Sequence, residues 1–466
     1  MKWPMPEQGV FSGVAGPVWL AAAGAALVAC GPRQDPSKAV CHSSTEYDGA
    51  RICDISAVAT AVRGDSVGTS VSSPGDVDGD GLGDLWVLGS SGAYLIHGPM
   101  RRDRHVDRAQ ATLTAGNQEI YRVSPGGDVD RNGSADLAVL YGGALEVGLL
   151  RDDIRGEVTL DDLDYIIPCY GELKDPSALG YPATTTLGDV TGDGGSEVFI
   201  PDFDRNDDPT PQVWSFTHVH DPEFYPWDHR YFGTNGVAAG DVNGDGLADL
   251  WIASDEAVYL FEPPFEYREH YGPGNYAARI DTCGDGRRAS GNAMCSPGDL
   301  NGDGHPELVI GSPERCFCSN PYPDYEGHVF LWYGPFDEHE SLDSADAELS
   351  TPHPLDGTGR TLYAIGDVDS DGRDDLAIGS KKANVQGESD GVLWFFLEHI
   401  EGFVHVHEAT IGVSAGDSSR FGAHYAGEHD IDGDGIADVL IGAPMHAHDR
   451  GDGAVWMLSG VVIAEL

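Results

Sequence analysis

The chain has 466 residues, of which 77 are acidic and 27 are basic, so its formal net charge at pH 7 is −50. A surface of this sign repels polyanions, which excludes nucleic acid as a partner. The composition agrees with an exported acidic protein.

The N-terminal segment predicts export. Lys2 precedes an apolar stretch of about a dozen residues, 18–29, which is too short to span a bilayer and is typical of a signal-peptide core. The stretch ends in LVAC followed by Gly31, which resembles a bacterial lipobox. The resemblance implies that residues 1–29 are a lipoprotein signal peptide, that Cys30 is lipidated, and that Gly31 in place of Asp favours the outer membrane or cell surface. The alternative is an ordinary secretory signal that is cleaved nearby.

The rest of the chain is divided accordingly. Residues 30–47 are expected to be the lipidated cysteine and a tether, and residues 48–466 a single repeat domain. No other segment of the sequence could span a membrane.

An acidic motif recurs seven times, each time followed by a short apolar run. Its first copy is GDVDGDGLGDLWV and its last is HDIDGDGIADVLI. The first acidic residues of the copies are Asp76, Asp128, Asp189, Asp241, Asp299, Asp367 and Asp430, at intervals of 52 to 68 residues. Regular spacing in this range predicts stacked supersecondary units.

Each motif has the pattern of a loop around a hard cation. Side-chain oxygens stand at positions 1, 3, 5 and 9, a glycine stands at position 6, and position 7 offers its carbonyl. Oxygen donors favour Ca²⁺, whereas Zn²⁺ and copper prefer Cys or His. The predicted ligands of up to seven structural Ca²⁺ ions are Asp76, Asp78, Asp80, Leu82 and Asp84; Asp128, Asp130, Asn132, Ser134 and Asp136; Asp189, Thr191, Asp193, Gly195 and Glu197; Asp241, Asn243, Asp245, Leu247 and Asp249; Asp299, Asn301, Asp303, His305 and Glu307; Asp367, Asp369, Asp371, Arg373 and Asp375; and Asp430, Asp432, Asp434, Ile436 and Asp438.

The motif is not an EF-hand. An EF-hand loop needs a bidentate Glu at position 12, where this chain has apolar residues such as Val87 and Ile252. The residues after position 9, such as DLWVLG, are rich in β-branched side chains and predict a buried strand. A dockerin-like pair is also excluded, because there are seven copies.

Each repeat contains signals for four strands. A small-residue segment such as SVSSPG precedes each loop and suits an innermost strand, and an aromatic segment such as AVYLFE follows the post-loop strand. Four strands in about 60 residues, repeated seven times, predict an all-β fold, a seven-bladed β-propeller with a Ca²⁺ loop between strands 1 and 2 of each blade. The last repeat is one strand short, so we expect residues 52–62 to supply its outer strand.

These repeats resemble the FG-GAP repeats of the integrin α-subunit propeller. The fullest match is RFGAHYAGEHDIDGDGIADVLIGAP, where Phe421 and Gly422 precede the loop and Gly442, Ala443 and Pro444 follow it. The resemblance covers about residues 48–466. The third loop departs from the pattern with Thr191 and Glu197, and the chain lacks an integrin's leg domains and membrane helix, so the likeness is to the propeller module alone.

Seven cysteines remain when Cys30 is set aside. Cys41 with Cys53 is one expected bridge. Cys283 and Cys295 fall in one connection, and Cys316 and Cys318 fall in the next, both on the rim away from the acidic loops. We expect disulfides between these two connections. Cys169 is then left unpaired. Zinc binding is the rival interpretation, although the sequence has no CxxC pair.

The same rim is the predicted binding face, because its long insertions are aromatic. Exposed Tyr and Trp suit sugar rings or protein surfaces; the candidates are Phe224, Tyr225, Trp227, Tyr322 and Tyr325. The alternative is that these rings pack beneath their own loops.

No catalytic motif appears. The sequence has no GxSxG, HExxH, phosphate-binding loop or dinucleotide fingerprint. We therefore expect a non-catalytic calcium-binding module on the cell surface that recognises a protein or glycan. The alternative is a polysaccharide-binding lectin or a polysaccharide-active enzyme on the same propeller, since the many acidic residues leave a carboxylate pair possible.

Overall fold

The fold is known from a computed structural model. It describes residues 41–43, 51–55, 59–142, 146–150, 154–168, 185–200, 212–214, 223–224, 235–254, 256–265, 270–271, 274–284, 287–288, 293–312, 315–317, 320–324, 327–351, 353, 356–384, 391–415, 421–422, 424–446 and 453–466. Within these residues no helix is long and apolar enough to cross a membrane. The predicted signal peptide and Cys30 lie outside the described residues.

The described chain is almost entirely β-structure, as predicted. Its one α-helix is α1 (Gly460–Glu465) at the C-terminus, and the other helical segments include four short 3-10 turns, η3 (Val106–Arg108), η4 (Leu160–Asp162), η6 (Leu342–Ser344) and η7 (Val406–Glu408). The strands form seven sheets of four to six strands and two short hairpins.

Each sheet begins with an innermost strand and continues outward. The first is β4 (Ser70–Gly75), β5 (Asp84–Leu88), β6 (Ala93–Ile96), β8 (Ala111–Thr114) and β12 (Gly156–Thr159). The second is β9 (Ile120–Gly127), β10 (Asp136–Tyr141), β11 (Glu146–Leu150) and β13 (Tyr165–Pro168). The third is β14 (Thr185–Gly188), β15 (Glu197–Ile200), β16 (Gln212–Trp214), β17 (Glu223–Phe224) and β21 (His270–Tyr271). The fourth is β18 (Gly236–Gly240), β19 (Asp249–Ala253), β20 (Ala257–Phe261), β22 (Ala278–Asp281) and β30 (His339–Ser341).

The remaining three sheets follow the same order. The fifth is β25 (Ala293–Cys295), β26 (Leu308–Ser312), β29 (His328–Trp332), β31 (Ala347–Ser350) and β35 (Gly402–His405). The sixth is β32 (Thr358–Gly366), β33 (Asp375–Ser380), β34 (Val392–Phe396), β36 (Ile411–Ser414), β2 (Arg51–Asp54) and β1 (Cys41–Ser43). The seventh is β37 (Tyr425–His429), β38 (Asp438–Ala443), β39 (Ala454–Leu458), β3 (Thr60–Arg63) and β7 (Arg104–His105).

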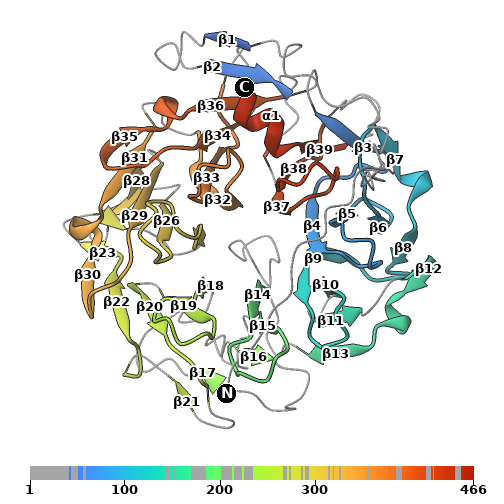
Figure 1. Ribbon diagram of the computed structural model, residues 1–466, viewed down its shortest axis with the longest axis horizontal. Helices are drawn as coiled ribbons and strands as arrows, with labels where there is room; N and C mark the ends of the chain where they lie inside the picture. Colours follow the sequence, from blue (N-terminus) through green and yellow to red (C-terminus); the bar gives the residue numbers. More distant parts are fainter. Residues whose placement is uncertain are drawn as a thin grey trace, which may run out of the picture. The chain divides into compact units, whose positions relative to one another are not determined.

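The first strands of neighbouring sheets contact one another in order, from β4 through β9, β14, β18, β25 and β32 to β37, and β37 contacts β4. Figure 1 shows the later strands of each sheet lying farther from this centre. Side-chain hydroxyls bridge some neighbours: Ser70 donates to the Val123 carbonyl at 3.1 Å, and Ser296 donates to the Ala239 carbonyl at 3.1 Å. Small residues in these strands permit this close approach.

The core lies between successive sheets. The second strands begin with an acidic residue and continue with side chains that are all buried, as in β5 and β19. Large aromatic side chains fill the space between sheets, and five tryptophans are almost completely buried: Trp86, Trp251, Trp332, Trp394 and Trp456. Both faces of these strands are therefore covered, as the continuous apolar runs after position 9 predicted.

Several sheets carry an additional parallel strand that comes from the following repeat. The chain leaves its third strand, pairs with the outer edge of the preceding sheet, makes a 3-10 turn and returns as its own fourth strand. Thus β12 pairs in parallel with β8, β30 with β22, and β35 with β31. These strands cover edges that would otherwise expose unpaired backbone groups. They were not predicted from the sequence.

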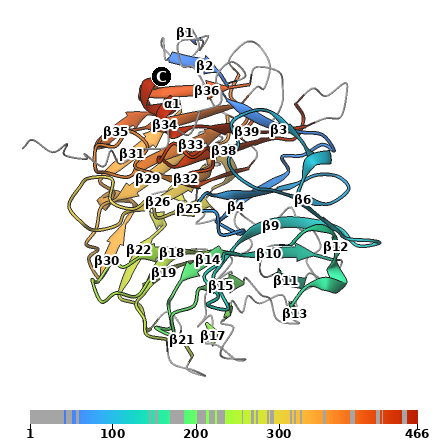
Figure 2. The same cartoon turned by 45° about the vertical axis from the view of Figure 1, so that its right-hand side comes forward.

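The N-terminal part of the domain completes the last sheet. Strand β3 pairs antiparallel with β39, which confirms the prediction that residues near 52–62 supply the missing outer strand. Only Thr60–Arg63 do so, because Arg51–Asp54 instead form β2, which pairs in parallel with β36. Both views place β1 and β2 beside β36 and the C-terminal helix (Figures 1 and 2).

One predicted disulfide is present. Cys41 and Cys53 are bonded and lie opposite each other in the β1–β2 pair. Strand β1 therefore lies within the segment 30–47 that was assigned to the tether. The hairpins β23–β24 (Cys283–Gly284 and Arg287–Arg288) and β27–β28 (Arg315–Phe317 and Asn320–Asp324) come together through β24 and β27. The predicted cross-links between these two connections involve cysteine side chains outside the described part of the chain. Cys169 also lies outside it. These cysteine assignments therefore stay predictions.

Substitution of Val62 tests the closure of the seventh sheet. Val62 is fully buried in β3, opposite Val455 of β39. Val62→Asp would place an unpaired carboxylate in this core and is expected to lower the free energy of unfolding by about 3–5 kcal/mol. The control Asn117→Asp adds the same charge at an exposed position and should change the free energy of unfolding little. Equal denaturant midpoints for the two variants would contradict the closure.

Candidate metal-binding loops

The acidic loops are turns built around the carboxylate at position 1. In the first loop Asp76 accepts hydrogen bonds from the backbone N–H groups of Gly79, Asp80 and Gly81 at 2.7 to 3.0 Å. Positions 4 and 6 of this loop have positive φ, 79° and 88°, which explains the glycines. In the second and sixth loops Arg131 and Ser370 adopt this conformation at position 4.

Position 9 supplies a buried carboxylate in every loop. This carboxylate is the first residue of the second strand, except in the fifth loop, where it immediately precedes that strand. Its side chain is at most 1% exposed in all seven copies: Asp84, Asp136, Glu197, Asp249, Glu307, Asp375 and Asp438. In every loop one of its oxygens accepts the N–H of position 2, as from Val77 to Asp84 at 2.9 Å and from Leu300 to Glu307 at 2.6 Å. This bond ties the start of the loop to the second strand.

Burial strongly disfavours the charge on these groups. Desolvation raises the pKa of Asp249 and Asp375 to about 7. Neighbouring carboxylates raise these pKa values further, whereas backbone hydrogen bonds lower them. The same causes raise the pKa of Glu307 and Asp438 to about 8. Such carboxylates need a positive charge nearby to be ionised at neutral pH.

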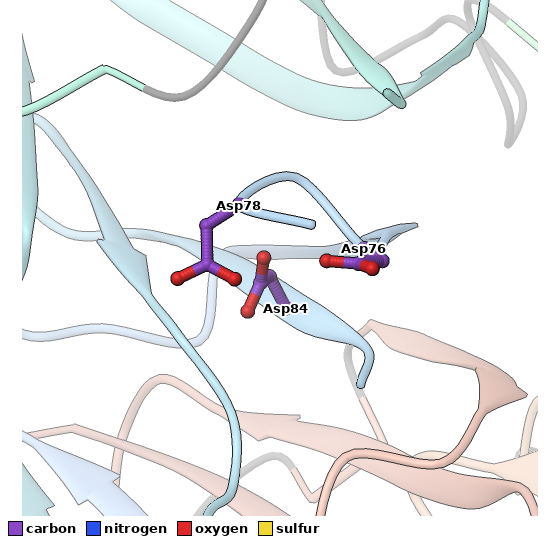
Figure 3. Close-up of side chains that lie close together, drawn as sticks. All are labelled: Asp76, Asp78 and Asp84. Carbon is purple, nitrogen blue, oxygen red and sulfur yellow. The ribbon is translucent and has the colours of Figure 1, made fainter. Parts of the chain in front are cut away.

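The carboxylates converge in a way that fits a cation. Ligand oxygens of Asp76, Asp78 and Asp84 lie within 4.8 Å of one another, as Figure 3 shows. Similar groups form in the second, third, fifth and sixth loops. Buried oxygens of Asp78, Asp249, Glu307 and Asp432 make no hydrogen bond with the described residues. Oxygen donors of this kind fit a hard divalent ion such as Ca²⁺.

Individual loops differ in their details. In the third loop Asp189, Asp193 and Glu197 converge, although Thr191 donates its hydroxyl to Glu197 at 3.1 Å. Arg131 of the second loop contacts Asp193 of the third, and Arg373 contacts Asp371 within the sixth. At position 7 the N–H donates to the side chain of position 5 in all seven loops, as from Leu82 to Asp80 at 2.9 Å.

Backbone hydrogen bonds link neighbouring loops. The N–H of position 8 donates to the carbonyl of position 1 in the preceding loop, from Gly83 to Asp430 at 2.8 Å and from Ser196 to Asp128 at 3.0 Å. The same bond joins Ala248 to Asp189 and Asp374 to Asp299. A change of conformation in one loop is therefore transmitted through this hydrogen bond to the loop of the next sheet.

The residues after the third strand also contact the loops, a role that was not predicted from the sequence. The N–H of Gly98 donates to Asp84 at 2.9 Å, and His97 lies 2.9 Å from Asp78. Arg101 donates to the carbonyl of Asp432 at 2.6 Å, across to the seventh sheet. A signal was available, because Gly98, Gly334 and Gly460 each follow a third strand at the same place.

The aromatic side chains of the predicted binding face lie outside the described part of the chain. Phe224 lies in β17 and Tyr322 in β28, but their side chains are outside the described part. Tyr225, Trp227 and Tyr325 are also outside the described residues.

Comparison with known proteins agrees with this architecture. Residues 241–310 match the FG-GAP-like repeat model, and residues 295–329 and 421–458 match the FG-GAP repeat model. These segments are similar to FG-GAP repeats. The last one begins at Phe421, as the sequence pattern predicted. An FG-GAP array in an all-β chain fits a β-propeller.

Curated relatives with FG-GAP similarity are integrin α-subunits. The chain is 30% identical to integrin alpha-4 of Xenopus laevis over 156 residues, 33% of this chain and 14% of that protein. It is 30% identical to integrin alpha-IIb of Homo sapiens over 147 residues, 31% and 14% of the two chains. It is 26% identical to integrin alpha-5 of Xenopus laevis over 229 residues, 47% and 20%. The chain thus spans a fifth or less of these relatives' length.

The position-9 acids predict an unusual pH dependence for the metal-free protein. Between their ordinary pKa near 4 and the raised values of about 7 to 8, the folded state holds protons that the unfolded state has released. The unfolding free energy should therefore fall as pH rises from 5 to 8. Burial lowers the pKa of His424 and His429, so these two groups make the unfolding free energy rise with pH. They are fewer than the position-9 acids.

Thermal melts of chelator-treated protein at pH 5 and pH 8 check this prediction. The melting temperature should be higher at pH 5 without metal, whereas excess Ca²⁺ should remove or reverse the order because it displaces the protons. Asp438→Asn, which removes one such acid, should reduce the pH dependence. A metal-free protein that is more stable at pH 8 would contradict the assignment.

Proposed function

We propose that the seven sheets are the blades of a seven-bladed β-propeller in which up to seven Ca²⁺ ions occupy the acidic loops between strands 1 and 2. The propeller is a non-catalytic recognition module that binds a protein or glycan on the cell surface. The similarity of its FG-GAP repeats to integrin α-subunits supports an adhesion-type role. The metal ions are structural and shape the loop rim.

One observation carries the calcium assignment. Each of the seven loops buries a carboxylate at position 9, and the uncompensated cost of such a charge is several kcal/mol. The described surroundings offer N–H donors but few cations: Arg101, Arg131 and Arg373 each contact a single loop. A divalent ion would compensate all the carboxylates of a loop at once.

Calcium removal tests this proposal. Chelation is expected to lower the melting temperature markedly, and readdition of Ca²⁺ should restore it, because the loop carboxylates repel one another without the ion. Equilibrium dialysis should find up to seven bound Ca²⁺ per chain. An unchanged thermal transition after chelation would refute the calcium assignment.

A single-site variant makes the stoichiometry specific. Asp84→Asn should bind one Ca²⁺ fewer than the parent and melt at a lower temperature in Ca²⁺. Asp107→Asn removes the same charge from an exposed residue outside the loops and should bind as the parent does. Equal Ca²⁺ counts for the parent and Asp84→Asn would exclude the first loop as a site.

The recognition role is tested with the calcium-loaded domain on glycan and extracellular-protein arrays, alongside an assay of reducing-sugar release. Saturable binding without sugar release is the expected result. Release of reducing sugar from a bound polysaccharide would instead identify a polysaccharide-active enzyme. Binding confined to glycans would identify a lectin.

We also propose that the chain is exported and anchored through a lipid on Cys30, which rests on the sequence LVAC-Gly31. Expression in a bacterium with a labelled fatty acid should label the parent chain in the membrane fraction. Cys30→Ser should abolish the label, and Cys295→Ser, a substitution within the domain, should leave it. An unlabelled parent would favour the ordinary secretory signal.

A further inference from the structure

A cavity of about 610 Å³ lies where the first strands of all seven sheets meet. Its wall includes residues of β4, β9, β14, β18, β25, β32 and β37, the strands that surround the centre in Figure 1. The volume falls within the range of about 300–1,000 Å³ that small-molecule sites occupy. The acidic loops lie at one end of these strands, because each first strand ends where its loop begins.

The charge of the wall is opposite to that of the protein. Among the described residues that line the cavity there are two arginines and two histidines, Arg122, Arg360, His424 and His429, and no aspartate or glutamate. The chain as a whole has 77 acidic and 27 basic residues. Burial lowers the pKa of both histidines, so the charge of the wall at neutral pH comes from Arg122 and Arg360.

Both arginines and one of the histidines lie at the end away from the loops. Arg122 and Arg360 are each the third residue of their strand, and His424 precedes β37. Lys381 follows β33, whose chain runs away from its loop toward the same end. Burial and the nearby charges of Arg122 and Lys381 hold the pKa of His424 well below its ordinary value, which shows that these side chains from three sheets approach one another.

The two arginines of the wall, Arg122 and Arg360, supply donors for a ligand in the cavity. A guanidinium group presents charged N–H donors in a planar fork, which is the geometry that carboxylate, sulfate and phosphate groups prefer.

We infer that the axial cavity is a binding site for a small anion, held by Arg122 and Arg360 at the end opposite the acidic loops. The ligand bears a carboxylate or a tetrahedral oxyanion, and the guanidinium groups donate hydrogen bonds to it. This inference rests on the cavity and its charge and does not depend on calcium in the loops.

Isothermal titration of the full domain in calcium buffer tests the inference, with sodium sulfate and sodium succinate as separate probes and sodium chloride as the ionic-strength control. Saturable binding of at least one probe with one site per chain is expected. Tighter binding of sulfate points to a tetrahedral oxyanion, and tighter binding of succinate points to a carboxylate. Heats no larger than those of chloride for both probes would overturn the inference.

Variants locate the site. Arg122→Gln combined with Arg360→Gln should weaken binding by about tenfold or more, as expected when hydrogen bonds to a charged ligand are lost. Arg102→Gln combined with Arg108→Gln removes the same two charges at exposed positions outside the cavity and should bind as the parent does. An equal loss in this control would show that net charge alone is responsible and would refute the site.

A second measurement on the parent chain does not require the arginine variants to fold. The imidazole resonances of His424, assigned by comparison with His424→Asn, should shift saturably as sulfate or succinate is added, since an anion beside Arg122 changes the field at this ring. His353, away from the cavity, should not shift with the same concentration dependence. Unchanged His424 resonances at concentrations that produce binding heat would place the ligand elsewhere and refute the inference.

Discussion

The structure depends on a carboxylate that is buried at position 9 of each loop. This group lies where the loop meets the second strand, and its hydrogen bond from the N–H of position 2 closes the turn between the two inner strands of a sheet. A charge at this depth is unfavourable without a counter-charge. The conformation of every sheet near the centre is therefore linked to the group that compensates the position-9 carboxylate. The other carboxylates of each loop are arranged around the same point.

Neighbouring sheets are held together by four kinds of contact that act at different distances from the centre. Hydroxyls such as Ser70 and Ser296 bridge the first strands, and the position-8 N–H groups bridge several of the loops. Farther out, parallel strands such as β12 and β35 join the edge of one sheet to the chain of the next. Between these lie the buried tryptophans and aliphatic side chains, which supply most of the favourable burial.

Much of this arrangement could be predicted from the sequence because it repeats. The small-residue strands, the loops and the buried strands that follow position 9 have strong local signals, and β4 and β5 fall where SVSSPG and DLWVL predicted them. The additional parallel strands could not be recognised in the same way. They are two to four residues long and partly exposed, so they lack a marked apolar alternation, and their partners are distant in sequence.

A weaker repeated signal did accompany these strands. A buried apolar residue opens each 3-10 turn that follows one of them, as Val106, Leu160, Leu342 and Val406 do. The basic character of the cavity wall was also hidden in the sequence, since Arg122, Arg360 and His424 are far apart in the chain and no local pattern distinguishes them. Only the closing of the sheets around one centre brings them together.

The bridge between Cys41 and Cys53 has a mechanical consequence. Tension applied to the chain before residue 41 passes through the covalent bridge into the middle of β2 instead of peeling β1 from its neighbour. Strand β2 runs parallel to β36, with Ile52, Cys53 and Asp54 opposite Gly412, Val413 and Ser414. Tension on the chain before Cys41 is therefore borne by β2 and by its pairing with the sixth sheet.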